Sequence, residues 1–305
     1  MPASESDEEA DESASYVVKG IRFGEEVRGV RAKMESSPVN YLRQLLEEDP
    51  PNGRLDRAAL ELATLGTPDL EPEPFLDRLN EMASQLADRM RNFNDGRDFV
   101  ETAQRYLFGE LGFHGNQEDF FDPGNSFLNQ VLERRTGIPI TLSVMYMEIA
   151  RRLAMPVFGI GLPRHFIIQF DDGNYSTYID PYNGGRTLTV QECFALAGAK
   201  VADPILLRRA SKKQIAMRML QNLRGVYLRR REWARAIDTL DLLLVGAPEL
   251  SGLLKQRGLL HMELKRFQAA RGDLETYLAM EPEAADRDEI RKQIRAIHAW
   301  LARVN

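Results

Sequence analysis

From residue 39 onward, apolar side chains recur at the spacing of an amphipathic helix. The apolar face of the first run consists of Tyr41, Leu42, Leu45 and Leu46. The run ends at Asp49-Pro50-Pro51, because proline cannot continue a helix. The same spacing predicts further helices over residues 55–65, 75–90 and 99–111. Residues 16–112 are therefore expected to form a helical N-terminal region, and nothing in their pattern indicates catalytic chemistry.

A turn at Asp122-Pro123-Gly124 opens the middle of the chain. The residues after it predict a helix over 127–135, for which Asn125 or Ser126 can provide the N-cap. Gly137 is predicted to end this helix, because glycine readily adopts the left-handed conformation found just after a helix C-terminus.

The next helix is expected over residues 141–153, and Pro139 suits its first turn, where the missing N–H costs nothing. Two apolar segments follow, at 158–170 and 175–185, separated by the turn dipeptide Asp172-Gly173. We predict that both segments are strands.

The last third of the chain is predicted to be helical, and it repeats. Three pairs of residues lie 34 positions apart: Trp233 and Phe267, Ala236 and Ala270, and Pro248 and Pro282. This period is typical of the tetratricopeptide repeat (TPR), a helix–turn–helix unit in which the aromatic residue packs at the turn. Two repeats are too few to stack alone, so we expect residues 288–303 to form a capping helix.

The composition is that of an ordinary globular protein. The chain has 305 residues, of which 43% are apolar and 28% charged, enough for about two domains. No apolar run approaches the roughly 18 residues that span a bilayer, and the acidic start lacks the pattern of a signal peptide. The single cysteine, Cys193, excludes an intramolecular disulfide and a Cys-based zinc site. We expect a cytoplasmic protein that does not bind membranes.

Charge is distributed unevenly. The net charge of −6 matches the first twelve residues, which contain six acids and no base. Such a stretch buries too little apolar surface to fold, so residues 1–15 are expected to be a disordered acidic tail. Residues 208–235 contain ten bases and one acid, a face that nucleic acid could bind. The pI is about 5.5 and no recognised nucleic-acid-binding motif accompanies this face, so nucleic acid is not the favoured ligand. An acidic protein segment, from a partner or from the chain's own tail, matches it equally well.

One histidine and one aspartate mark the predicted strands. His165 lies in the first segment, and Asp180 lies in the second. A helix start that faces a strand-borne His and a strand-borne Asp is the arrangement of a Cys-His-Asp acyl-transfer site. No cysteine stands at this helix start.

Residues 112–166, from GFHGNQEDFFDPGNSFLNQVLERRTGIPI to LPRHF, and the later motif YIDPYNGG resemble the SirB-type family of bacterial transglutaminase-like proteins. The resemblance extends over about residues 40–300. It implies an α+β, mostly helical protein with a papain/transglutaminase-like core, in which one helix packs against a small antiparallel sheet. A helical N-terminal region precedes this core, and TPR helices follow it. The chain departs from the family pattern at Ala154 and Arg164, where glycine is expected.

The same resemblance places the catalytic cysteine of active transglutaminase-like enzymes at about Pro139, counted back from RRLAMPV. Proline has no nucleophile, whereas His165 and Asp180 keep their places. The nearest hydroxyls belong to Thr141 and Ser143, which are more often a cap and a packed helix residue than nucleophiles. The His–Asp pair could itself serve only to hold two strands together.

Cys193 is predicted to lie in the first turn of a short helix that Thr189 caps. A displaced nucleophile is conceivable there, although a buried small apolar residue is the more common role.

Four residues near the core motifs are candidates for binding: Asn125, Asn129, Arg135 and Asn183. The asparagines can equally satisfy backbone groups of loops, and a Glu–Arg pair around residue 135 can fix the turn. His114 has no second His or Cys at ligand spacing, so neither a metal nor a cofactor is expected.

Two functions follow from these residues. The first is a non-catalytic transglutaminase-like protein, a pseudoenzyme, that acts as a protein-interaction or regulatory module through its TPR segment. The alternative is a hydrolase or acyl-transferase that uses a non-cysteine or displaced nucleophile with His165 and Asp180. The predicted parts are a tail over 1–15, a helical region over 16–112, the core over 113–204 and the repeats over 205–305.

Overall fold

A computed structural model describes residues 39–199, 201 and 203–304. The predicted acidic tail and residues 16–38 lie outside the described residues. Within them the protein is α+β and mostly helical, with a small antiparallel sheet, as predicted.

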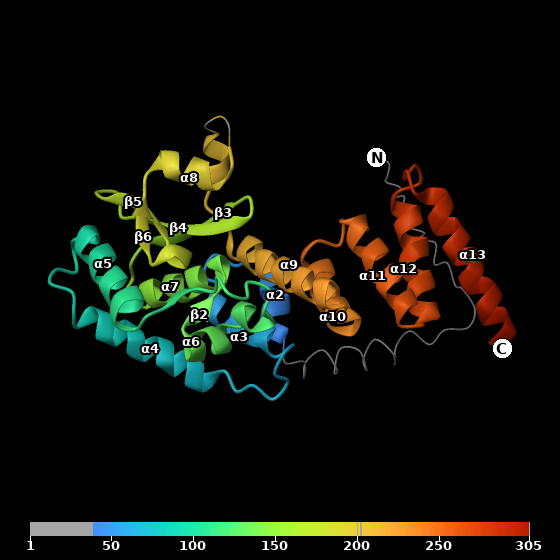
Figure 1. Cartoon of the computed structure of the whole chain (residues 1–305), viewed down its shortest axis with the longest axis horizontal. Helices are drawn as coiled ribbons and strands as arrows, with labels where there is room; N and C mark the ends of the chain where they lie inside the picture. The colour runs from blue at the N-terminus through green and yellow to red at the C-terminus, as the bar shows by residue number, and fades with distance from the viewer. Residues whose placement is uncertain (1–38, 200, 202, 305) are drawn as a thin grey trace, which may run out of the picture. The chain divides into compact units, whose positions relative to one another are not determined.

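The N-terminal region is helical, as its spacing predicts (Figure 1). Its helices are α2 (Asn40–Glu48), α3 (Leu55–Ala63), α4 (Glu73–Ala87) and α5 (Gly96–Ala103), and α5 continues as a π-helical stretch over Gln104–Glu110. Helix α5 begins earlier than predicted because the side chain of Asp95 caps it, accepting hydrogen bonds from the backbone of Arg97 and Asp98.

Helix α6 (Leu128–Arg134) is capped differently from the prediction. Neither Asn125 nor Ser126 is its N-cap, because both belong to a 3-10 turn (Pro123–Ser126) that Asp122 caps instead. Gly137 does not end the helix either. Arg135 takes the left-handed conformation (φ 60°), so that the chain is already extended when β2 (Thr136–Gly137) pairs with β1 (His114–Gly115).

Helix α7 (Pro139–Arg152) is the centre of the fold. Pro139 occupies its first turn as predicted, and every side chain from there to Ala150 is buried. A helix that is buried on every side must be covered by other elements, and α3, α4, α6, β3 and β4 all contact it. After the helix, Ala154 adopts a left-handed conformation (φ 55°), which explains why glycine is expected at this position.

The sheet has four antiparallel strands in the order β3 (Val157–Leu162), β4 (His165–Asp171), β5 (Ser176–Asp180) and β6 (Arg186–Leu188). The prediction of one strand over 158–170 is wrong, because Pro163 and Arg164 form a tight turn that divides it. Arg164 has φ 59° in that turn, the second position at which glycine is expected. One face of the sheet packs towards α7, and the other carries α8 (Val190–Leu196).

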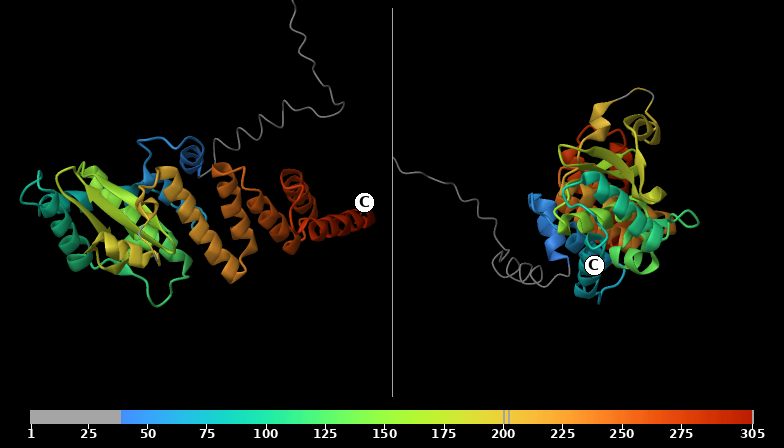
Figure 2. Two further views of the ribbon diagram at one scale, coloured as in Figure 1. Left: turned by 90° about the horizontal axis from the view of Figure 1, so that it is seen from above. Right: turned by 90° about the vertical axis from the view of Figure 1, so that its left-hand side faces the viewer.

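The C-terminal part consists of helix pairs followed by a single helix (Figures 1 and 2). The pairs are α9 (Lys212–Arg230) with α10 (Trp233–Gly246) and α11 (Ser251–Glu263) with α12 (Phe267–Met280). Ala236 and Ala270 are fully buried, as the repeat requires. The predicted capping helix is α13 (Arg287–Val304), which packs on α12. Among the described helices, none is long and apolar enough to cross a membrane.

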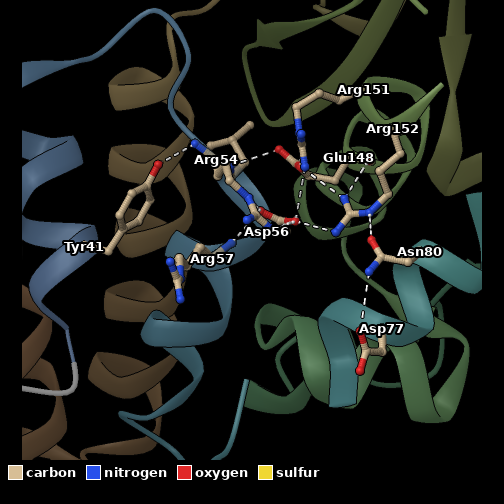
Figure 3. A network of polar contacts seen from close by, with 10 residues as sticks. Tyr41, Arg54, Asp56, Arg57, Asp77, Asn80, Glu148, Arg151 and Arg152 are labelled. Carbon is tan, nitrogen blue, oxygen red and sulfur yellow. Dashed lines mark hydrogen bonds and ion pairs between the residues drawn. The ribbon is translucent and has the colours of Figure 1, made fainter. Parts of the chain in front are cut away.

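A cluster of ionised side chains lies at the end of α7 (Figure 3). Asp56 and Glu148 are completely buried. Glu148 accepts a hydrogen bond from the backbone N–H of Leu55 at 3.0 Å and from Arg151 Nε at 2.6 Å. Arg152 Nη2 lies 2.7 Å from Asp56 Oδ2. The cluster therefore ties α3 to α7 through charge-assisted hydrogen bonds.

We expect Asp56→Asn to lower the free energy of unfolding by roughly 3 kcal/mol, because it leaves the nearly buried Arg152 without one of its carboxylates. Burial raises the pKa of Asp56, but the hydrogen bonds from Arg54 and Arg152 outweigh it and lower the pKa to about 2. The difference in the free energy of unfolding between wild type and Asp56→Asn is therefore fully present above the pKa of the unfolded aspartate, about 4. It disappears as the pH falls through about 2, the pKa of Asp56 in the folded protein. Urea unfolding at several pH values measures it.

The matched control is Glu110→Gln, which removes an exposed ion pair with Arg89 of 2.9 Å and should cost at most about 1 kcal/mol. If the two substitutions lowered the free energy of unfolding equally at neutral pH, the larger stabilisation predicted for the buried cluster would be contradicted.

Candidate functional site

The structure brings the predicted histidine and aspartate together. His165 is the first residue of β4, and Asp180 is the last residue of β5. His165 Nε2 lies 3.0 Å from Asp180 Oδ1, and the Asp180 side chain is fully buried. The distance is short enough for a hydrogen bond, but the direction of the ring nitrogen towards Oδ1 is not favourable for one.

The turn after β5 completes the surroundings of Asp180. The backbone N–H groups of Tyr182 and Asn183 donate to Oδ1 at 3.2 and 3.3 Å, and Asn183 Nδ2 donates to Oδ2 at 2.8 Å. Burial raises the pKa of Asp180, but the contacts with His165 and Asn183 outweigh it and hold this pKa below its ordinary value. The carboxylate is therefore ionised and fixed beside the imidazole.

The register of the sheet determines on which face the side chains of His165 and Asp180 lie. His165 is paired with Leu162, and Asp180 with Arg186. Because paired residues share a face, His165 lies on the face of Leu162, which packs in the cluster around Cys193. Asp180 shares that face, since it follows Tyr178 by two residues. The side chains that pack towards α7, such as Ile168, are on the opposite face.

The start of α7 supplies no nucleophile in contact with the pair. Pro139 stands in the first turn. The hydroxyls of Thr141 and Ser143 are buried and have no hydrogen-bond partner, so neither is bonded to His165. The helix start, the histidine and the aspartate thus occur along the chain as predicted. No hydroxyl from the helix start is hydrogen-bonded to His165.

Cys193 lies on the same face as the pair, in α8, and is fully buried. Burial raises the pKa of its thiol to about 11, and the charges of Glu192 and Asp180 add to the effect. A nucleophilic cysteine needs a lowered pKa and access to the substrate. Cys193 has neither property, and its neighbours are apolar side chains.

The four candidate binding residues have different surroundings. Asn125 holds a loop, accepting from Asn116 Nδ2 at 3.1 Å and donating to the carbonyl of Asp119 at 2.7 Å. Asn129 is buried, and its Oδ1 has no partner. Arg135 ends α6. Asn183 alone of these four contacts the His–Asp pair.

A cavity of about 710 Å³ lies beside this pair. Sequence reasoning missed most of its lining, which includes His114, Glu118, Arg134, Thr136 and Tyr182. Tyr182 joins the cavity to the pair, because its ring lies against His165 with centroids 6.1 Å apart and its hydroxyl donates to the carbonyl of Asn116 at 2.8 Å. The motif YIDPYNGG, which places a tyrosine between Asp180 and Asn183, was the available signal.

Arg134 pairs with Asp122 at 2.6 Å, so an aspartate is its partner where the sequence suggested a Glu–Arg pair around residue 135. Among residues 39–199, 201 and 203–304, no three His, Cys, Asp or Glu side chains are grouped so as to hold a metal ion.

Two family models match the chain. Residues 73–221 match the transglutaminase-like superfamily, and residues 223–295 match the tetratricopeptide repeat. The fold and these matches together define a transglutaminase-like domain followed by TPR helices.

The chain is 37% identical to a UPF0162 protein of Xylella fastidiosa (strain 9a5c), over 63% of this chain and 71% of that protein. It is 26% identical to a UPF0162 protein of Vibrio cholerae, over 83% of this chain and 96% of that protein. The chain belongs to the UPF0162 family. It is also 34% identical to human F-box only protein 21, over 52% of this chain but 27% of that protein. No solved structure matches the chain.

The state of Cys193 gives a direct test of the displaced nucleophile. We expect the native thiol to react with Ellman's reagent at pH 8 at least about a hundredfold more slowly than the unfolded thiol, because it is buried and its pKa is about 11. Stopped-flow absorbance with and without urea measures the two rates. Rapid labelling of the native protein would contradict the assignment of Cys193 to the core.

Proposed function

We propose that this protein is a non-catalytic, SirB-type member of the transglutaminase-like proteins and acts as a protein-interaction or regulatory module in the cytoplasm. The observation that carries the proposal is the state of the His165–Asp180 pair. It is intact, yet none of Thr141, Ser143 and Cys193 is hydrogen-bonded to it. A general base without a nucleophile cannot perform covalent acyl transfer.

The TPR helices support the interaction role, since stacked repeats present extended faces for partners. The 34-residue period relates α9 to α11, so that Gln221 corresponds to Lys255 and Gly225 to Leu259. On α9 this face is partly covered by the core, where the guanidinium of Arg229 lies 3.9 Å from the ring centroid of Phe121.

On α11 the corresponding face is open. It lines a hollow of about 570 Å³ together with Arg224 and the loop residues Glu249 and Leu250. Leu250 is 47% exposed there, although it is a large apolar residue. Exposed apolar residues of this kind are typical of binding surfaces when they stand beside polar groups. We place the partner on this face of α11.

The test compares the sets of proteins captured by the wild type, a variant of the hollow and a control variant. We expect purified wild-type protein to retain one or more partners that the double substitution Leu250→Glu, Gln256→Arg loses by at least about tenfold, because a buried apolar contact and its rim are both changed. The control is Met280→Glu, a similarly exposed apolar residue at the end of α12 outside the hollow. Quantitative mass spectrometry of the captured proteins measures the ratio. A partner set that is the same for all three proteins contradicts the proposal.

The alternative function is a hydrolase or acyl-transferase. It is favoured by one observation, the cavity of about 710 Å³ that Tyr182 and Asn183 line next to the His–Asp pair. We expect no turnover above background on a panel of amide and ester substrates, and no change in His165→Ala.

Turnover that His165→Ala abolishes while leaving the thermal midpoint unchanged would overturn the non-catalytic proposal. Thr141→Val, Ser143→Ala and Cys193→Ala then identify the nucleophile, because each removes one reactive group with little change in volume.

A further inference from the structure

A second hollow, of about 650 Å³, lies where the sheet meets the first TPR helix. The segment before α9 runs along β3, because the N–H of Ala210 donates to the carbonyl of Gly159 at 2.8 Å and Arg209 forms a β-bridge with Ile160. This pairing brings Arg208 and Arg209 beside the first turns of α9. The hollow is therefore built by regular backbone contacts.

Four cations and one carboxylate line this hollow: Arg208, Arg209, Lys213, Arg218 and Asp49. Two of these five groups already have a partner in the protein. Arg209 is paired with Asp171 and donates to Gln169 Oε1 at 3.0 Å. Asp49 Oδ1 accepts the backbone N–H of Lys213 at 2.8 Å.

The remaining three cations have no carboxylate. Arg208 is exposed and Lys213 is half-buried, and neither side chain makes an ion pair in the described part of the chain. Arg218 is half-buried, and Nη2 donates only to the carbonyl of Leu162 at 3.2 Å. Burial lowers the pKa of Arg218 with no compensating anion. A partly desolvated guanidinium of this kind is stabilised when an anion binds beside it.

Elsewhere in the basic segment, three of the arginines are already engaged by other side chains. Arg230 and Arg235 share Glu232, each at 2.8 Å, and Arg229 lies over Phe121. A duplex needs cations spread along its backbone, whereas Arg208, Lys213 and Arg218 line one concave site. Outside the hollow, the six other bases of residues 208–235 are accompanied by the single acid Glu232, so that part of the segment remains basic.

We propose that this hollow binds the phosphate group of a small phosphorylated molecule, held by Arg208, Lys213 and Arg218. A phosphate dianion accepts hydrogen bonds on several oxygens and matches the planar fork of two guanidinium groups. A single carboxylate would leave part of this charge unpaired. The volume admits a nucleotide, with Met217 supplying an apolar wall.

Titration calorimetry of the full chain with pyrophosphate, inorganic phosphate, AMP and adenosine, at a constant ionic strength of about 0.15 M, tests the site. We expect saturable binding of pyrophosphate and AMP but not of adenosine. Arg218→Gln should weaken the Kd for pyrophosphate about tenfold or more, and Arg208→Gln severalfold. Arg208 is exposed, so its loss separates binding from folding.

The matched control is Lys292→Gln, an exposed base on α13 outside the hollow, which should leave the Kd within about twofold. The proposal is overturned if wild type shows no saturable binding at up to about 10 mM pyrophosphate, if Lys292→Gln weakens binding as much as Arg218→Gln, or if adenosine binds as well as AMP. It is also overturned if duplex DNA displaces pyrophosphate and Arg231→Gln weakens the duplex as much as Arg218→Gln, since that would mark an extended nucleic-acid face.

Discussion

Helix α7 can occupy the centre of this protein only if Glu148, its buried carboxylate, is compensated. An ionised carboxylate without partners in the interior is very costly. Here it receives the Leu55 N–H and the guanidinium groups of Arg151 and Arg152, and Arg152 in turn reaches Asp56. The charges of α3 and α7 thus compensate one another, which fixes the helix that positions the sheet and its loops.

The sheet against this helix separates two environments. One face joins the main core around α7, and the other forms a smaller cluster around Cys193. His165 and Asp180 belong by register to the second face. His165 and Asp180 therefore stay together on this face, and neither Thr141 nor Ser143 is hydrogen-bonded to them. Asp180 also has a structural role, because its side chain accepts the backbone N–H groups of Tyr182 and Asn183 in the turn that follows it.

Helix α9 has two roles that the repeat period alone does not reveal. Its residues correspond one by one to those of α11, yet α2 and the loop around Phe121 cover part of it. The same helix carries Lys213 and Arg218 into the hollow beside β3. The first repeat unit is thus built into the transglutaminase-like domain, and the face of the second unit is the one left open.

Local physics was sufficient for much of the fold. Apolar spacing located the helices, Pro139 marked the start of α7, and the 34-residue period identified the repeats, because each of these depends on neighbours in the chain. The turn at Pro163 and Arg164 was missed although Pro163 is a local turn signal. The pairing of β3 with β4 is what requires Arg164 to adopt a left-handed conformation.

The sequence by itself determined the element types, the repeats and the presence of a His and an Asp without a cysteine before them. Only the tertiary structure decided which face of the sheet holds that pair, whether Thr141 or Ser143 contacts it, and which of ten bases lack a partner. The physical reason is that the first set depends on the spacing of residues along the chain. The second depends on strand register and on packing between elements that are far apart in sequence.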